Sequence, residues 1–177
     1  MTYPRAPMHG FTIIELIVTM TIAGMLMMFA VPALNTFVQN QRLTTVTNSL
    51  VLSLNFARSE AIKRDAAAGV TICASTDQQA CNGANWAQGW MVVDVVANSG
   101  SLQGMPAIAS TNTVSEANGQ LQIVFRSNGA ATNAASFTIC DARGASYAHS
   151  VDVGPTGRVL SSPTPGMTVY NTALAYP

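Results

Sequence analysis

Residues 10–38 have the sequence GFTIIELIVTMTIAGMLMMFAVPALNTFV, and this stretch decides the fold class. From Leu16 to Gln41 the chain has no Lys, Arg, Asp or Glu. The apolar part, Phe11 to Phe37, exceeds the roughly 20 residues that a helix needs to cross a hydrocarbon layer of about 30 Å. It has no polar face, whereas the core helix of a soluble domain has one. The sequence therefore predicts a protein with a single membrane-spanning helix.

A secretory signal peptide is the alternative interpretation of this segment. Such a peptide has a shorter apolar core and a small-residue cleavage site after it, and Val31-Pro32-Ala33 is a poor site of this kind. The position of Glu15 favours a different cut, because a carboxylate in hydrocarbon costs about 2.5–3.5 kcal/mol and needs a partner. Cleavage after Gly10 would place the new ammonium of Phe11 at i and Glu15 at i+4, on one helix face.

The run Gly10–Leu16, GFTIIEL, closely resembles the prepilin cleavage signature of type IV pilins and type II secretion pseudopilins. The resemblance implies that a membrane prepilin peptidase cuts after Gly10 and N-methylates Phe11. It also implies that Glu15 pairs with the terminal amine of a neighbouring subunit during assembly. Pro32 matches a family proline that kinks the helix, since proline lacks an N–H and its ring clashes with the preceding turn.

The rest of the chain predicts an α+β, pilin-like fold, in which the long N-terminal helix packs on an antiparallel β-sheet. Apolar residues recur at steps of three and four beyond Phe37, which extends the helix to about Ala67. Short apolar runs then predict strands at 70–74, 89–96, 121–125, 136–140, 146–153 and 158–160. We expect residues 97–119 to be mainly loop, and residues 161–166 to be a turn-rich linker. The resulting divisions are a leader at 1–10, a transmembrane and assembly helix at 11–38, and a periplasmic globular domain at 39–177.

Several later segments are similar to the GspH and FimT/FimU family of pseudopilins and minor pilins. They are LNFARSEAIKR at 54–64, VTIC at 70–73, the Trp86, Gly89 and Trp90 segment, FRSNGA at 125–130, SFTICDARG at 136–144 and VGPTGRV at 153–159. The resemblance implies a structural subunit of a type II secretion pseudopilus or a type IV pilus, with a tip or priming role. Its partners would be other pilins, bound through the N-terminal helix, the prepilin peptidase and the bacterial inner membrane, which it would cross once.

DNA binding during natural transformation is the alternative function, because some FimT-type minor pilins bind DNA. The family motif there is a C-terminal Gly-Arg-x-Arg, and Gly157-Arg158-Val159-Leu160 lacks the second arginine. Arg143 is the nearest other candidate. Because the formal net charge is zero, few counterions would be released, and we expect any DNA affinity to be weak and sensitive to salt.

Cysteines and charged residues offer little other chemistry. The chain has three Cys, and Cys73 and Cys81, at the ends of a short polar loop, are the favoured disulfide pair. Cys73 with Cys140 is the alternative pair. No CxxC motif is present and His149 is the only histidine after Gly10, so we expect no zinc site. No hydrolase, metalloprotease or phosphate-loop motif occurs, and we expect neither enzymatic activity nor a cofactor.

Overall fold

The structure, a computed structural model, describes residues 10–65, 68–94 and 100–174. The chain divides into two compact units, Met1–Gln39 and Asn40–Pro177. Helix α1, Ile13–Lys63, contributes to both units. In the first unit α1 is uninterrupted through Pro32, and the whole described segment is exposed to solvent. One segment of α1 is long and apolar enough to cross a membrane, judged by its length and composition, with a mean hydropathy of 2.1.

In the second unit, α1 packs one face into the core. The apolar residues that recur at steps of three and four beyond Phe37 are buried: Leu43, Val46, Leu50, Leu54, Ala57 and Ala61. The helix ends at Lys63, whose charge lies in the last turn, where it complements the negative end of the helix dipole. The predicted end near Ala67 lies outside the described residues.

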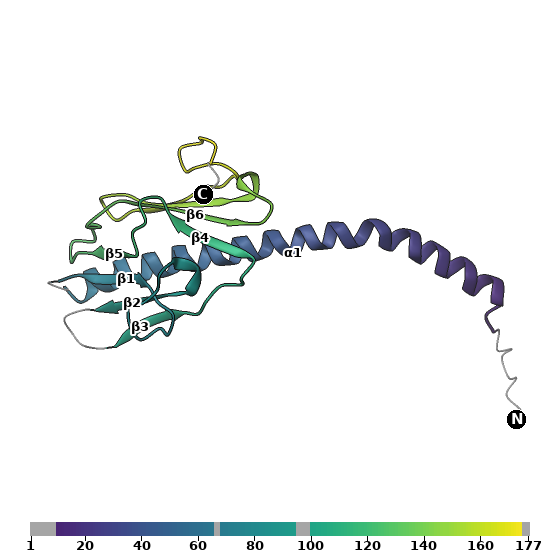
Figure 1. The fold of residues 1–177 in the computed structure, drawn as a ribbon, viewed down its shortest axis with the longest axis horizontal. Helices are drawn as coiled ribbons and strands as arrows, with labels where there is room; N and C mark the ends of the chain where they lie inside the picture. The colour runs from purple at the N-terminus through teal and green to yellow at the C-terminus, as the bar shows by residue number, and fades with distance from the viewer. Residues whose placement is uncertain (1–9, 66–67, 95–99, 175–177) are drawn as a thin grey trace, which may run out of the picture. The chain divides into compact units, whose positions relative to one another are not determined.

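The predicted α+β arrangement of a long helix on antiparallel β-structure is confirmed, and the strands are divided between two antiparallel sheets (Figure 1). The first sheet has the order β3-β2-β1-β5, from strands Ser101–Met105, Trp90–Asp94, Val70–Ala74 and Gln122–Phe125. The second has the order β4-β6-β7-β8, from strands Asn112–Glu116, Ala135–Asp141, His149–Val153 and Val159–Ser161. Two short 3-10 turns, η1 at Trp86–Gln88 and η2 at Ala145–Tyr147, precede β2 and β7.

The prediction that residues 97–119 are mainly loop is wrong for two segments, which form β3 and β4. Residues 97–99 lie outside the described residues. β3 and β4 are edge strands, each paired along one side only, to β2 and β6. Their sequences, SLQGM and NTVSE, lack the apolar alternation typical of strands, and backbone pairing overrides that weak propensity. The strand predicted from Ser146 begins only at His149, because η2 occupies the preceding residues. Of the strand predicted at 89–96, the last two residues lie outside the described residues.

One hydrophobic core joins α1 to both sheets. Leu50 and Leu54 of the helix pack in the same cluster as Ile72 of the first sheet and Phe137 of the second. Trp86 contacts Phe137 edge-on, with ring centroids 5.0 Å apart, and both rings are buried. All residues of this cluster lie within Leu43–Val159. The unit of residues 40–177 therefore contains all of the core that the described residues form, and we expect it to fold as an independent domain.

Candidate functional site

The segment around Gly10 precedes the first turn of α1. The Thr12 hydroxyl accepts a 3.3 Å hydrogen bond from the backbone N–H of Glu15, and the Thr12 carbonyl accepts one from Leu16. A threonine oxygen in this position satisfies one of the free N–H groups of a helix start. Gly10 and Phe11 are exposed and lie just before this cap.

Nothing within the described chain requires a glycine at position 10. A Cβ added to Gly10 would meet no atom within 4 Å, and the backbone there is not in the left-handed conformation. By contrast, Gly157 has a positive φ of 73°, and a Cβ added there would overlap neighbouring backbone. A requirement for glycine at position 10 would therefore come from another molecule that binds this segment.

Glu15 is the only charged residue from Gly10 to Gln41. It lies in the first turn of α1 among exposed apolar side chains, including Ile14 and Leu16. No Lys or Arg in the described part of the chain forms an ion pair with it. Glu15 is thus available to a cationic partner outside the described residues.

The cysteines occupy separate environments. Cys73 and Cys81 form a disulfide with their Cα atoms 5.5 Å apart, and the bond closes the loop that follows β1. Asp77 organises this loop, because its carboxylate accepts hydrogen bonds from the N–H groups of Gln79 and Ala80. These hydrogen bonds lower the pKa of Asp77. Cys140 is free and buried in β6, in the other sheet from Cys73.

Arg143 is held by neighbouring groups of its own chain. Its Nη2 donates a 2.8 Å hydrogen bond to Asp141 and its Nη1 a 2.8 Å hydrogen bond to Asn40 Oδ1 on α1. Its guanidinium carbon lies 4.2 Å from the ring centroid of Tyr147. Burial of Asp141 acts to raise its pKa, but the hydrogen bonds from Arg143 outweigh this and lower it. Arg143 therefore joins the η2 turn to the helix and presents little free charge.

Arg158 lies elsewhere, on an exposed turn beside α1. Arg58 donates from Nε to the Gly129 carbonyl at 3.1 Å and from Nη2 to the Thr156 carbonyl at 3.4 Å. The turn that contains Arg126 and the turn that contains Arg158 therefore meet at Arg58. Arg143 contacts α1 at Asn40, whereas the turn that carries Arg158 contacts it at Arg58. These two helix positions are 18 residues apart, which is roughly 27 Å along the helix.

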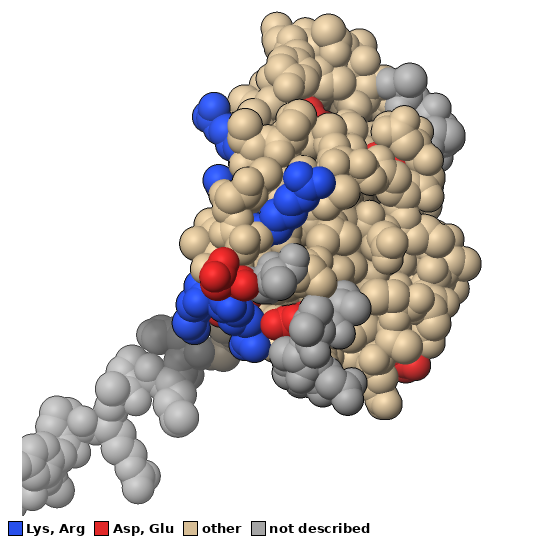
Figure 2. Space-filling model, turned by 90° about the vertical axis from the view of Figure 1, so that its left-hand side faces the viewer, with Lys and Arg blue, Asp and Glu red and all other residues tan. Residues whose placement is uncertain are grey.

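Five of the eight Lys and Arg residues belong to this end of the domain, which we call the basic end: Arg58, Lys63, Arg64, Arg126 and Arg158. Figure 2 shows blue side chains gathered on this face. Glu60 partly neutralises it, since it pairs with Arg64 at 2.6 Å and with Lys63 at 3.5 Å. The zero net charge of the sequence does not indicate that arginines lie together on adjacent turns.

The structure does not assemble a catalytic group around His149. Half-burial lowers the pKa of this imidazole, which favours its neutral form. His149 and Asp152 are three positions apart on β7, so their side chains point to opposite faces of the sheet. Within the described ranges, no group of three His, Cys, Asp or Glu residues could hold a metal ion.

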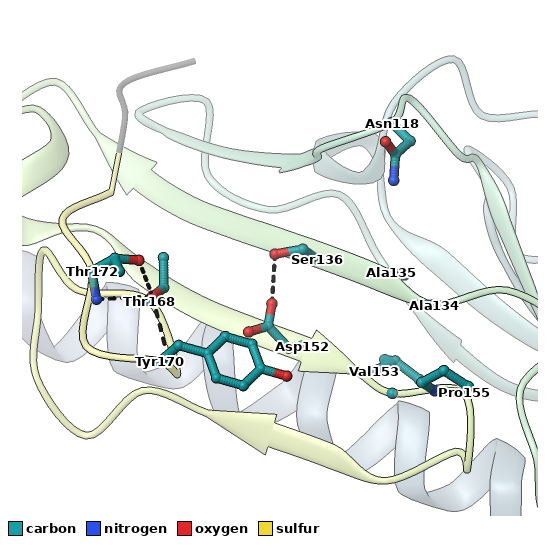
Figure 3. A pocket seen from close by; sticks show the side chains of 11 residues that line it. Asn118, Ala134, Ala135, Ser136, Asp152, Val153, Pro155, Thr168, Tyr170 and Thr172 are labelled. Atoms are coloured by element: carbon teal, nitrogen blue, oxygen red, sulfur yellow. Dashed lines mark hydrogen bonds between the residues drawn. The ribbon is translucent and has the colours of Figure 1, made fainter.

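Sequence reasoning missed one pocket, on the outer face of the second sheet. Asp152 on β7 lies opposite Ser136 on β6 in the strand register, and the two side chains are hydrogen-bonded. The C-terminal segment that carries Tyr170 lines the same pocket (Figure 3). No local pattern could have found it, because its members come from distant parts of the sequence.

Comparisons with known proteins match the N-terminal segment and most of the globular domain. A family model described as type II transport protein GspH matches residues 46–157, and a model of the prokaryotic N-terminal methylation motif matches residues 5–31. Two crystal structures of the type IV minor pilin FimU from Pseudomonas aeruginosa are similar. One has a TM-score of 0.59 and 22% identity, over 72% of this chain and 92% of that chain. The other has a TM-score of 0.56 and 21% identity, over 68% and 93%. At these identities the likeness establishes the fold. A search of curated protein sequences finds no significant match.

Proposed function

The chain belongs to the GspH family of type II transport proteins, and from this premise we propose that it primes assembly at the tip of a pseudopilus or pilus. Proteins of this family are structural subunits, so the chain is a minor pilin or pseudopilin and not an enzyme. One observation supports a role as an assembled subunit: a methylation motif at residues 5–31 is joined, in one chain, to a GspH region at residues 46–157. This pairing implies processing by a peptidase and assembly with other pilins.

The hydrophobic helix and the methylation motif agree with an inner-membrane pseudopilin. We place the membrane-spanning segment at residues 11–38 and the domain of residues 39–177 in the periplasm. Residues 1–10 form the leader on the cytoplasmic side. The exposed apolar side chains of α1 support this arrangement, since hydrocarbon or neighbouring helices would cover them.

Cleavage after Gly10 and methylation of Phe11 are the first steps of the proposed pathway. The exposed position of both residues and the absence of any internal need for Gly10 support recognition by a peptidase. The new terminal amine then pairs with Glu15 of a neighbouring subunit. A carboxylate in an apolar surrounding gains most from such a charged partner.

Mass spectrometry of the membrane-extracted protein tests the processing steps. We expect a chain that starts at Phe11 and carries one methyl group on its amine. Gly10→Ala should block cleavage, whereas Gly24→Ala should leave it unchanged, although neither new Cβ meets an atom within 4 Å. Normal processing of Gly10→Ala, or a mature terminus near Ala33, would contradict the proposal.

Glu15→Ala separates processing from assembly. Cleavage should persist, while incorporation into filaments should fall, because the partner of the terminal amine is lost. Glu15→Asp keeps the charge and should retain part of the incorporation. Incorporation of Glu15→Ala at the level of the unmodified protein would show that the pairing argument is wrong.

Immunogold labelling of sheared filaments tests the tip role. Gold should mark filament ends, and deletion of the gene should reduce the number of filaments more than their length. Labels spaced along the filament would place the subunit within the shaft and refute the priming role.

DNA binding is a second candidate function, and the basic end favours it. Arg126 and Arg158 are exposed on turns that meet at Arg58, so Arg126 could supply the second cation that the Gly157-Arg158 motif lacks. Neutralisation of phosphates by such side chains makes binding weak at high salt.

Titration of the fragment of residues 40–177 with double-stranded DNA tests this candidate. If DNA binds, the log–log slope of affinity against salt should be about −0.9 for each phosphate contact. Arg126→Ala and Arg158→Ala should each flatten the slope by about one. Arg42→Ala, an exposed cation near the other end of the domain's helix, is the control. Undetectable binding at low salt would eliminate the candidate.

A further inference from the structure

The pocket on the outer face of the second sheet has a volume of about 310 Å³. Strands β6 and β7 form its floor, and the segment from Thr168 to Thr172 forms one wall (Figure 3). Two hydrogen bonds join the start of this segment to the domain: the Ser150 hydroxyl donates to the Met167 carbonyl at 3.2 Å, and the Gly166 N–H donates to the Ala148 carbonyl at 2.8 Å. Within the segment, the hydroxyls of Thr168 and Thr172 lie 2.6 Å apart. A pocket of this size matches the lower range of small-ligand sites.

Among the described residues that line the pocket, Asp152 has the only charged side chain. One carboxylate oxygen accepts a hydrogen bond from Ser136. The other oxygen has no hydrogen-bond partner among the described residues, and no Lys or Arg within them forms an ion pair with this carboxylate. The pocket therefore has a net negative charge with free acceptor capacity.

Tyr170 adds an aromatic ring to the same pocket. Its side chain is 77% exposed, although its backbone N–H is held by the Thr168 hydroxyl at 3.2 Å. Figure 3 shows the side chain extending from the C-terminal segment along the pocket. The face of such a ring attracts cations.

The same chain contains a filled version of this arrangement. At the η2 turn, the Arg143 guanidinium binds the Asp141 carboxylate at 2.8 Å and lies over the Tyr147 ring at 4.2 Å. The side-chain amide oxygen of Asn40 accepts a hydrogen bond from the same guanidinium. The pocket offers a carboxylate in Asp152 and an aromatic ring in Tyr170, but not the guanidinium (Figure 3).

We propose that this pocket receives an arginine side chain from a neighbouring subunit of the filament. The guanidinium binds the free oxygen of Asp152 and lies against the Tyr170 ring, as Arg143 does at its own site. A planar guanidinium suits this combination better than an ammonium, because it stacks on rings and presents several donors in a fixed fork. The identity of the donor as a filament subunit rests on the proposed function, whereas the chemistry of the pocket does not.

The chemistry is tested by NMR titration of the 15N-labelled fragment of residues 40–177. N-acetyl-arginine amide should shift the amide signals of Ser136, Asp152 and Tyr170 with millimolar affinity, and the neutral isostere N-acetyl-citrulline amide should not. Asp152→Asn keeps the shape of the side chain and should weaken arginine binding at least tenfold. Asp65→Asn removes an exposed carboxylate beyond the end of α1 and should leave arginine binding unchanged. Equal effects of citrulline and arginine, or an unchanged affinity in Asp152→Asn, would overturn the proposal.

The source of the arginine is tested in cells with the full chain. A photo-reactive benzoylphenylalanine at position 170 should crosslink to another pilin subunit in assembled filaments, within reach of an arginine of that subunit. If the protein is present in filaments and no pilin is crosslinked, the docking proposal is wrong. If the protein is absent from filaments while its fragment binds arginine, the proposed function is wrong instead.

Discussion

Trp90 Nε1 donates a 3.0 Å hydrogen bond to the Ser53 hydroxyl, and both residues are almost completely buried. The bond connects α1 to β2 across the core. A buried indole N–H needs an acceptor, and Ser53 provides one from within the apolar stripe of the helix. The helix and the first sheet are therefore aligned by one polar contact as well as by apolar packing.

Ser53→Ala should destabilise the domain by about 1–3 kcal/mol, because the Trp90 N–H would stay buried without an acceptor. Urea unfolding of the fragment of residues 40–177, followed by tryptophan fluorescence, measures this change. Ser59→Ala is the matched control on the exposed side of the same helix, and its effect should stay within about 0.5 kcal/mol. Equal midpoints for the two variants would show that the buried bond contributes nothing.

Gly157→Ala should cost about 2 kcal/mol or more, since φ is +73° and the new Cβ would overlap the Gly129 carbonyl oxygen. Gly154 lies in the same turn without a left-handed backbone, and its nearest atom would be 3.8 Å away. Gly154→Ala should therefore change the unfolding free energy by less than about 0.5 kcal/mol. A similar loss in both variants would mean that the turn is generally intolerant of side chains.

Alkylation under denaturing conditions should label one cysteine before reduction and three after it, because Cys73 and Cys81 are joined and Cys140 is free. Without denaturant, labelling of Cys140 should be slow, since it is buried. Cys81→Ser should lower the unfolding free energy by about 2.5 kcal/mol according to the chain-entropy model for so short a loop. Mass spectrometry of the peptides would reveal the alternative pair of Cys73 with Cys140, which lie in different sheets.

Acid should remove the contribution of Glu60 to stability. The hydrogen bond from Arg64 lowers the pKa of this carboxyl; burial opposes the effect, and the charges of Lys63 and Arg64 reinforce it. A carboxyl whose pKa is lower in the folded state stabilises the protein above its unfolded pKa of about 4.3, and this contribution is lost as pH falls through the folded value. The difference in unfolding free energy between the unmodified domain and Glu60→Gln should thus be greatest near neutral pH and shrink below about pH 4. In an Arg64→Gln background, the effect of Glu60→Gln on the unfolding free energy should depend much less on pH.

The helix was the most predictable element, because its signals are long and local. The run without charges from Leu16 to Gln41 and the apolar steps from Leu43 to Ala61 both follow from the helical period. The apolar runs of β1 and β5 were equally clear. β3 and β4 escaped prediction, since an edge strand is held mainly by backbone pairing and its side chains need not alternate.

Contacts between distant residues could not be predicted from the sequence. Glu116 is buried, and its carboxylate accepts hydrogen bonds from the N–H groups of Asn118, Gln120 and Ser136. No spacing in the sequence indicates that role. The same holds for Asp152 and Tyr170, which share a pocket only because the C-terminal segment folds over β7. The processing segment, by contrast, could be identified from the sequence, because its recognition depends on a short contiguous motif.

Burial of Cys140 has a consequence for a protein that assembles into polymers. This thiol is 1% exposed in β6, and its sulfur lies 2.9 Å from the Thr113 hydroxyl on β4. In an oxidising compartment, an exposed free thiol can form a disulfide with a thiol of another protein molecule that it contacts. Because the unpaired thiol is enclosed inside the domain, contacts that the folded protein makes through its surface would stay noncovalent, and such contacts can be reversed without a reductant.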